Sequence, residues 1–363
     1  MTKAEKIAAF DPNGVGAADA GLFGLPFSPD DAELVVIPVP WEVSVSYRAG
    51  TALGPQTVLD ASAQVDLYEP TIPDAWQLGI ALDEFDPTLE ARAADLRLEA
   101  ERYIDGLSGG EPEADPADPA SVPARATAAA QELRLWLKTR ATQHLDAGKL
   151  VAVLGGDHST PLGLLDALAA RYDDTAEENG FGILQFDAHA DLRAAYEGFE
   201  FSHASIMFNA LKLKPVKALV QVGLRDICEA EANVAAESGG RVTMFYDSYL
   251  QEERLNGTSW KKLCKKIVAA LPQHVYISFD IDGLDPKLCP GTGTPVPGGL
   301  EFEQACYLIK YVVKSGRRII GFDLNEVAPG TDPDWNGSVG ARLLYKLCNW
   351  MAVSQGKLRT TEF

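Results

Sequence analysis

The strongest constraint on the fold of this chain is a repeated alternation between short apolar runs of β-type residues and longer segments with helical spacing. Seven such runs occur, at residues 33–40, 149–156, 181–189, 216–224, 241–246, 274–282 and 317–327. Most are apolar at nearly every position, which is typical of strands buried on both faces of a parallel sheet. The pattern therefore predicts an α/β fold built from repeated βαβ units.

The expected helices lie between these runs, at residues 55–67, 88–106, 125–146, 160–172, 203–213, 228–237, 258–271, 301–315 and 338–352. Residues 106–124 are rich in Pro, Gly and acidic side chains, which predicts a solvated loop. Neither side of this loop resembles a separate core. We therefore expect one domain over residues 33–363, preceded by an N-terminal extension at residues 1–32.

The charge balance restricts the partners of the chain. Its 363 residues include 32 Lys and Arg against 52 Asp and Glu, so the formal net charge is -20. Such a field repels phosphate backbones and anionic lipid, so we expect neither nucleic acid nor membrane as a partner. It would attract a cationic substrate, although an acidic surface also simply maintains solubility.

Targeting signals and cysteines favour the cytoplasm. The N-terminal residues lack the basic stretch and apolar run of a secretory signal, and no apolar run approaches the roughly 20 residues of a spanning helix. The five cysteines are odd in number and form no CxxC pair, which is typical of reduced thiols.

Acids and histidines gather where three of the apolar runs end. One His follows the 149–156 run within the sequence GGDHS, and the 181–189 and 274–282 runs end in DAHAD and DID. Alternate residues of an extended chain share a face, and ligands bind at the carboxyl ends of parallel strands. We therefore expect six side chains to converge there: His158, Asp187, His189, Asp191, Asp280 and Asp282.

Four carboxylates at one point would repel one another unless cations lay among them. Each motif alone has an ordinary explanation, since DxHxD can be a solvated strand end and GGDHS a tight turn. Three apolar strands that all end in acids are nevertheless an odd structural choice, because buried unpaired acids are costly. The set predicts two divalent metal ions, and oxygen with imidazole suits Mn, Fe, Co, Ni or Zn rather than Ca.

Two further side chains are candidates for catalysis or substrate binding. His203 follows the second motif by about a dozen residues, and a mobile His with a pKa near neutrality is a common proton carrier. A helix N-terminal cap is the alternative role for His203. Glu326 ends the last apolar run and can hold a cationic substrate at the same edge. We expect His144 to lie on the surface and His274 to be structural.

Five motifs carry a resemblance to a known family. GGDHS, FDAHADLR, SFDIDGLDP, GTGTPVPGGL and NEVAPG resemble, in order and spacing, those of the ureohydrolase superfamily, which includes arginase, agmatinase, formimidoylglutamase and guanidine hydrolase. The resemblance spans about residues 33–352. It implies a three-layer α/β/α fold with a mainly parallel sheet of about eight strands, and a single catalytic domain.

The resemblance also implies a role for each candidate residue. It implies that one ion is held by His158, Asp187, Asp191 and Asp280, and the other by Asp187, His189, Asp280 and Asp282. His203 corresponds to the proton-shuttling His of the family, and Glu326 corresponds to the acid that binds the guanidinium group. Family members form trimers and hexamers, so we expect a homo-oligomer.

Finer motif details bear on the substrate. FDAHADLR with its Arg193, SHASIM around His203, and Leu59, where agmatinases tend to carry Arg, resemble the guanidine hydrolase branch. Arg193 also resembles formimidoylglutamase, where a cation could meet a substrate carboxylate. We therefore expect hydrolysis of free guanidine to urea and ammonia. Agmatinase, another guanidino-compound hydrolase and formimidoylglutamase are the alternatives.

The expected mechanism uses water rather than a covalent nucleophile, because no Ser or Cys has a base in its sequence context. Two ions, Mn or Ni, would activate water for attack on the guanidinium carbon, while Asp191 and His203 move protons. A non-catalytic subunit of a mixed oligomer and a two-metal phosphoesterase are the alternatives of other classes. The complete ligand set argues against the first, and GTGTPVPGG and NEVAPG have no role in the second.

Overall fold

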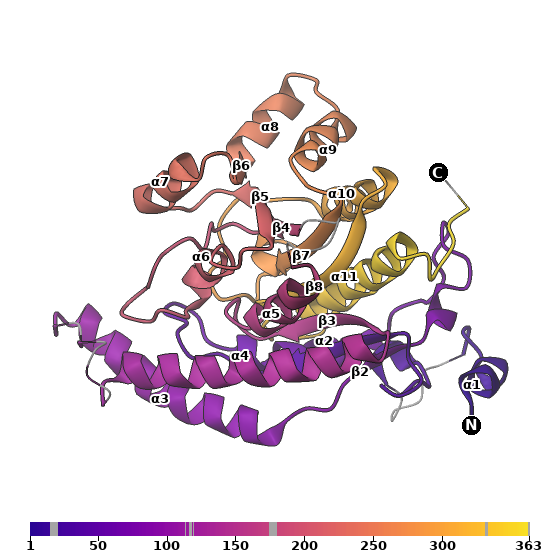
Figure 1. Ribbon diagram of the computed structural model, residues 1–363, viewed down its shortest axis with the longest axis horizontal. Helices are drawn as coiled ribbons and strands as arrows, with labels where there is room; N and C mark the ends of the chain where they lie inside the picture. The colour runs from indigo at the N-terminus through magenta and orange to yellow at the C-terminus, as the bar shows by residue number, and fades with distance from the viewer. Residues whose placement is uncertain are drawn as a thin grey trace.

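The computed structural model describes residues 1–14, 21–112, 114–115, 118, 120–173, 180–330 and 333–361. Within them, eight strands form one sheet in the order β2-β1-β3-β8-β7-β4-β5-β6, and each neighbouring pair is parallel (Figure 1). The strands are β1 Leu34–Val39, β2 Ile80–Leu82, β3 Leu150–Gly155, β4 Phe181–Phe186, β5 Val216–Leu224, β6 Val242–Tyr246, β7 His274–Asp280 and β8 Arg318–Asn325. The predicted α/β fold with a parallel sheet is confirmed.

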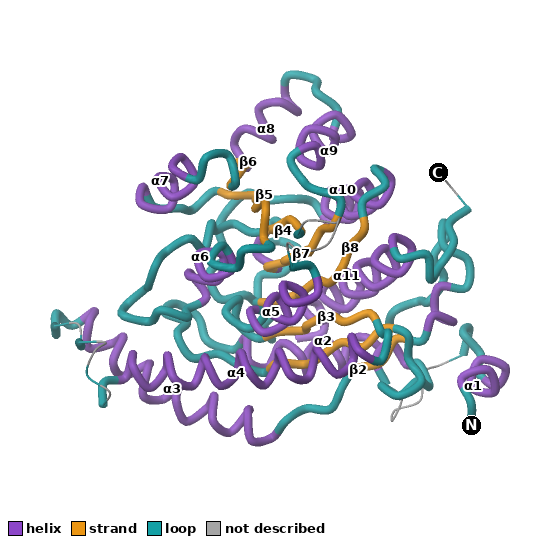
Figure 2. Tube along the Cα trace, viewed as in Figure 1, coloured by secondary structure: helices purple, strands orange, loops and turns teal. Residues whose placement is uncertain are grey.

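Helices flank the sheet, as Figure 2 shows. They are α1 Lys3–Ala9, α2 Gly54–Ser62, α3 Pro87–Ser108, α4 Val122–Asp146, α5 Leu162–Arg171, α6 Ile206–Ala210, α7 Glu229–Glu237, α8 Asp247–Leu255, α9 Trp260–Ala269, α10 Phe302–Lys314 and α11 Pro333–Ser354. Among the described residues, no helix has the length and apolar character needed to cross a membrane.

The sheet separates two hydrophobic cores, and the alternation of side chains along β3 produces this division. Val151 and Val153 face the core formed with α3, α4, α5 and α6. Ala152 and Leu154 face the opposite core, formed with α2, α9, α10 and α11. Because successive side chains of a strand point to opposite faces, an apolar residue at every position requires helices on both sides. The result is the expected three-layer arrangement.

Two long helices, α3 and α4, form an antiparallel pair along one side of the molecule (Figure 1). Asp86 caps α3 by accepting hydrogen bonds from the backbone N–H groups of Thr88 and Leu89, and Ser121 caps α4 in the same way through Ala124. Because α3 continues to Ser108 and α4 begins at Val122, the connection is shorter than the predicted loop at 106–124. Residues 113, 116, 117 and 119 of that loop lie outside the described residues.

Some elements differ from the sequence prediction. Strand β2 has three residues, too few to show a period, and α8 follows β6 without a turn residue between them. The N-terminal extension contributes Leu22, Phe23 and Leu25 to a hydrophobic core, and the ring of Phe23 lies 5.0 Å from that of Tyr345. Its division from a domain at 33–363 stays a prediction.

The strand order explains how the motifs meet. Because all strands are parallel, their carboxyl ends lie at one edge of the sheet. The runs that end in GGDHS, NEVAPG, DID and DAHAD are β3, β8, β7 and β4, and these are four consecutive strands in the sheet. Motifs far apart in the chain are therefore neighbours in space.

Candidate active site

Three acidic and histidine motifs meet at this edge. The Nδ1 atom of His158 lies 3.0 Å from Asp187 Oδ2, 3.0 Å from Asp191 Oδ2 and 3.3 Å from Asp280 Oδ2. All four residues are buried. His158, Asp187 and Asp280 place ligand atoms close enough together to hold one metal ion.

A second group of possible ligands lies beside the first and shares Asp187 with it. The Nδ1 atom of His189 lies 3.0 Å from Asp282 Oδ2 and 3.5 Å from Asp187 Oδ1. These three residues could hold a second ion. The structure thus brings together all six side chains that the sequence singled out.

Short-range hydrogen bonds hold the carboxylates in place. Asp187 Oδ1 accepts from the backbone N–H of His189 at 2.6 Å, and Asp187 Oδ2 accepts from Gln185 Nε2 at 2.7 Å. Asp282 Oδ1 accepts from the backbone N–H of Ala188 at 3.0 Å, which links the ends of β4 and β7. Asp191 has φ of 54°, a left-handed conformation that costs energy for a residue with a Cβ and is often retained at functional sites.

The electrostatics of this cluster fit a site for cations. His158 Nδ1 is buried and has no hydrogen-bond partner among the described residues. Burial, together with the charge of Asp187, raises the pKa of Asp191 to about 7. Burial and the charges of Asp282 and Asp187 raise the pKa of Asp280 well above its usual range. Divalent cations would relieve this repulsion between carboxylates and accept the unused lone pair of His158.

The opposite nitrogen of His158 is also held. Its Nε2 atom lies 2.9 Å from Ser278 Oγ, and Ser278 donates a hydrogen bond to Asp323 Oδ1 at 3.0 Å. Ser278 and Asp323 were not predicted from the sequence. A signal for Ser278 existed, since it lies two residues before Asp280 on one strand and therefore on the same face.

His203 lies in a short 3-10 turn, His203–Ser205, in the loop after β4. Its Nδ1 atom is 3.4 Å from Ser44 Oγ, and its ring packs edge-on against Tyr196 with 6.0 Å between the ring centres. Burial lowers the pKa of His203 to about 3. His203 is therefore neutral at pH 7, and its pKa lies below the near-neutral value expected from the sequence.

Glu326 lies directly beside the turn that carries His158. Its Oε1 atom accepts a hydrogen bond from the backbone N–H of His158 at 2.9 Å, and its own N–H donates to Gly156 O at 2.8 Å. Burial, together with the charges of Asp280 and Asp157, raises its pKa well above the usual range. A Cβ added at Gly293 would lie 2.7 Å from Glu326 Oε2, so the glycine leaves room for this carboxyl group.

Arg193 is engaged by its own neighbours. Its guanidinium carbon lies 4.9 Å from the ring centre of Tyr196, and its Nε atom lies 3.9 Å from Glu231 Oε2. These contacts bridge the loop after β4 and helix α7. A substrate contact for Arg193 stays a prediction.

The remaining two histidines lie away from the cluster. His144 is only partly exposed, at 15%, and its Nε2 atom lies 2.8 Å from Asp83 Oδ2, a pairing that the surface prediction did not include. The sequence could not show this pairing because Asp83 is 61 positions away. His274 is buried at the start of β7, with its ring centre 4.8 Å from that of Tyr172, in agreement with a structural role.

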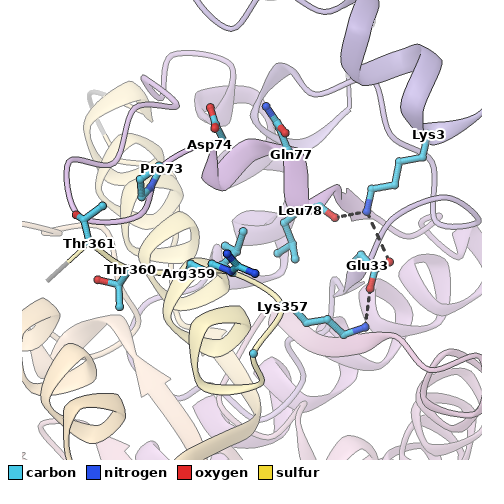
Figure 3. Close-up of a pocket in the computed structure, with 12 residues that line it drawn as sticks. Lys3, Glu33, Pro73, Asp74, Gln77, Leu78, Lys357, Arg359, Thr360 and Thr361 are labelled. Carbon is cyan, nitrogen blue, oxygen red and sulfur yellow. Dashed lines mark hydrogen bonds and ion pairs between the residues drawn. The ribbon is translucent and has the colours of Figure 1, made fainter. Parts of the chain in front are cut away.

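A separate cavity of about 830 Å³ opens near both ends of the chain (Figure 3). Lys3 and Lys357 approach Glu33 from two sides, at 3.7 Å and 2.7 Å. Glu33 directly precedes β1, so this cavity lies at the opposite edge of the parallel sheet from the acidic cluster. None of the six cluster residues lines it.

Comparison with known proteins identifies the family. The Arginase family model matches residues 32–349. The chain belongs to the arginase family. It is therefore a hydrolase of the ureohydrolase type, which acts on carbon–nitrogen bonds of guanidino compounds, and the resemblance noted from the motifs is confirmed at the level of the superfamily.

Curated relatives cover most of the chain. It is 33% identical over 309 residues to an N(1)-aminopropylagmatine ureohydrolase of Thermus thermophilus, covering 85% of this chain and 87% of the relative. It is 28% identical over 307 residues to an agmatinase of Bacillus anthracis, covering 84% and 86%.

Solved structures share the fold of this arginase-family chain. A hypothetical agmatinase from Burkholderia thailandensis has a TM-score of 0.68 at 24% identity and covers 94% of both chains. The proclavaminate amidino hydrolase of Streptomyces clavuligerus has a TM-score of 0.69 at 22% identity, covering 94% of this chain and 100% of the other. At these identities the likeness concerns the fold alone.

Proposed function

We propose that the chain hydrolyses the guanidino group of an aliphatic guanidino amine of the agmatine class, releasing urea and the corresponding amine. The similar proteins support this substrate class. The 33% identical relative is an N(1)-aminopropylagmatine ureohydrolase, and others are agmatinases. They support this class better than free guanidine, which the motif variants had favoured. A net charge of -20 also favours a cationic substrate.

The cluster residues are proposed to hold two divalent ions, Mn or Ni. His158, Asp187, Asp191 and Asp280 would hold one ion, and Asp187, His189, Asp280 and Asp282 would hold the other. The buried Nδ1 atom of His158 without a hydrogen-bond partner supports this assignment. When bound, such a pair supplies Lewis acidity and activates water for attack at neutral pH.

Glu326 is proposed to orient the guanidinium group. Its carboxylate lies at the same edge as the cluster and is fixed by the backbone of His158. A planar guanidinium donates two parallel hydrogen bonds to a carboxylate, which positions its carbon as well as its charge. Burial raises the pKa of Glu326, and a bound cation would favour its ionised form.

Asp191 and His203 are proposed to move protons. The carboxylate of Asp191 lies within the cluster, 3.0 Å from His158 Nδ1, where it could exchange a proton with water activated by the ions. His203 is neutral, so it can accept a proton, and its lowered pKa favours rapid release to solvent or to the departing amine. Its side chain is partly exposed, so it can exchange protons with solvent.

The setting of the enzyme is also a proposal. All five cysteines are free, and four of them are buried, which supports a reducing cytoplasm. Membership of the arginase family supports a homo-oligomer, a trimer or hexamer.

A substrate panel tests the proposed function. Urea release is measured from agmatine, N(1)-aminopropylagmatine, guanidinobutyrate, arginine and free guanidine, and release of formamide and glutamate from formiminoglutamate, with Mn and with Ni. We expect the highest kcat/KM for agmatine or N(1)-aminopropylagmatine. A preference for free guanidine, or hydrolysis of formiminoglutamate alone, would contradict the proposal.

A further inference from the structure

We propose that Arg97 of helix α3 is a positioning residue for His203: it anchors the 42–52 loop and thereby holds Ser44 against the imidazole. The family motifs contain no residue of α3, and Arg97 lies 54 positions from the loop carbonyl at Val43. The inference rests on the proposed function, because it assigns a purpose to the position of His203.

The 42–52 loop follows β1 and is closed at its base by Glu42. The Oε2 atom of Glu42 accepts hydrogen bonds from the backbone N–H groups of Gly50 at 2.8 Å and Ala52 at 3.0 Å, and from Thr51 Oγ1 at 3.0 Å. The base of the loop is buried, whereas the side chain of Tyr47 at its tip is 69% exposed. The loop is thus a compact segment held by its own buried carboxylate.

Arg97 reaches this base from outside the loop. Its Nη1 atom donates hydrogen bonds to the carbonyl oxygens of Val43, at 3.3 Å, and Val45, and its Nε atom lies 3.7 Å from Glu42 Oε1. The side chain of Arg97 is 17% exposed. Val43 and Val45 are the two neighbours of Ser44, so one guanidinium group fixes the backbone on both sides of that serine.

Ser44 transmits this constraint to the candidate proton carrier. Its Oγ atom lies 3.4 Å from His203 Nδ1. The backbone N–H of Val43 also donates to Asp157 Oδ2 at 3.3 Å, which joins the loop to the GGDHS turn that carries His158. The loop therefore links His203 to the metal-binding turn, and α3 contacts this link through Arg97.

Loss of Arg97 is expected to impair proton transfer more than substrate binding. Without the guanidinium, two buried carbonyl groups lose a charged donor, and the backbone around Ser44 gains freedom. Proton transfer depends steeply on distance, whereas the proposed guanidinium contact is made by Glu326, which follows β8. The expected result is a decrease in kcat with little change in KM.

The test compares R97M, R97K and a matched control, R92M, as metal-loaded full-length enzymes. Arg92 lies on the same helix and pairs with Glu132 on α4, away from the loop. Two quantities are measured: steady-state kinetics with agmatine, and hydrogen–deuterium exchange of the 42–52 backbone by mass spectrometry. Metal content and circular dichroism show that each variant is loaded and folded.

We expect R97M to lower kcat by about tenfold or more, with KM within about threefold, and to speed exchange in the 42–52 loop. R97K restores one charged donor and should recover part of both losses, and R92M should match the wild type. If R97M fails to fold, R97K is compared with R92M by kcat and by backbone exchange of the 42–52 loop. A lower kcat and faster loop exchange in R97K alone would support the inference.

Unchanged exchange and unchanged kcat in the Arg97 variants would overturn the inference, as would an equal loss of kcat in R92M. A wild-type enzyme that hydrolyses no guanidino compound would instead defeat the proposed function. The exchange measurement would then still show whether Arg97 holds the loop, so the two failures are distinguishable.

Discussion

His158 Nε2 lies 2.9 Å from Ser278 Oγ, and the direction of this hydrogen bond determines the chemistry of the cluster. Ser278 donates its own hydrogen to Asp323, so its oxygen accepts from Nε2. The ring proton of neutral His158 is therefore on Nε2, and the lone pair of Nδ1 points to the carboxylates of Asp187, Asp191 and Asp280. A buried hydrogen-bond chain thus prepares the imidazole as a metal ligand.

Removal of the Ser278 hydroxyl is expected to weaken metal binding. Ser278→Ala leaves the Nε2 hydrogen without an acceptor and frees the ring to turn, so the affinity for Mn or Ni should fall about 10- to 100-fold. Competition with a chelator measures this affinity. Ser238→Ala, which removes a half-buried hydroxyl at the end of α7, is the control. Equal affinities in the two variants would exclude this role for Ser278.

Gly293→Ala is expected to impair substrate binding while metal binding persists. The new Cβ would lie 2.7 Å from Glu326 Oε2, so the carboxyl group must move away from its present position. We expect kcat/KM for agmatine to fall by about tenfold or more. Metal content and the kinetics of Gly14→Ala, where the nearest atom to the new Cβ is 3.4 Å away, are the controls. A Gly293→Ala enzyme with normal kcat/KM would contradict the assigned role of Glu326.

Asp83 is expected to make stability depend on pH. Burial opposes its ionisation, but hydrogen bonds from His144 and from Arg140, at 2.6 Å and 2.8 Å, outweigh burial and hold the pKa of Asp83 below its usual 3.8. The unfolded chain therefore binds a proton more readily than the folded one. The stabilisation is complete above pH 3.8 and is lost as the pH falls below that value.

Asp83→Asn is thus expected to lower the free energy of unfolding at pH 7 by roughly 1–3 kcal/mol, because Arg140 and His144 lose a charged acceptor. Urea unfolding of the metal-free protein at several pH values measures this difference. The difference in unfolding free energy between variant and wild type should become smaller below about pH 4, because the unfolded Asp83 carboxyl group binds a proton there. A difference in unfolding free energy that grew on acidification would contradict the proposed stabilisation by ionised Asp83.

Local sequence patterns predicted seven of the eight strands in the described residues, all but β2, and singled out the residues that meet in the cluster. Each motif follows an apolar run, and a spacing of two predicted that its acids and histidines would share a face. In the structure Asp187, His189 and Asp191 lie beyond the end of β4, and Asp282 lies in a 3-10 turn after β7, so these turns rather than an extended strand bring the side chains together. That these runs form neighbouring strands depends on packing between distant segments. No local pattern specifies that β8 lies between β3 and β7.

The residues that support the cluster were harder to predict. Ser278 lies two residues before Asp280 on β7 and so on the same face, but serine hydroxyls are common in strands and do not by themselves indicate a role beside a metal site. Arg97 lies on a separate helix whose charged face looks solvated in sequence, and its contact with Val43 is a product of tertiary packing. The conformation of Glu326, with φ of 65°, likewise arises from its contacts with the GGDHS turn.

We propose that the six cluster side chains, His158, Asp187, His189, Asp191, Asp280 and Asp282, hold two metal ions on which hydrolysis depends. The most direct test is metal analysis of the Mn- or Ni-loaded wild type and of Asp187→Ala, together with urea release from agmatine by the same samples. Because Asp187 belongs to both ligand groups, we expect about two ions per chain in the wild type, and loss of both metal and activity in the variant. An Asp187→Ala protein that releases urea at the wild-type rate without bound metal would contradict the account.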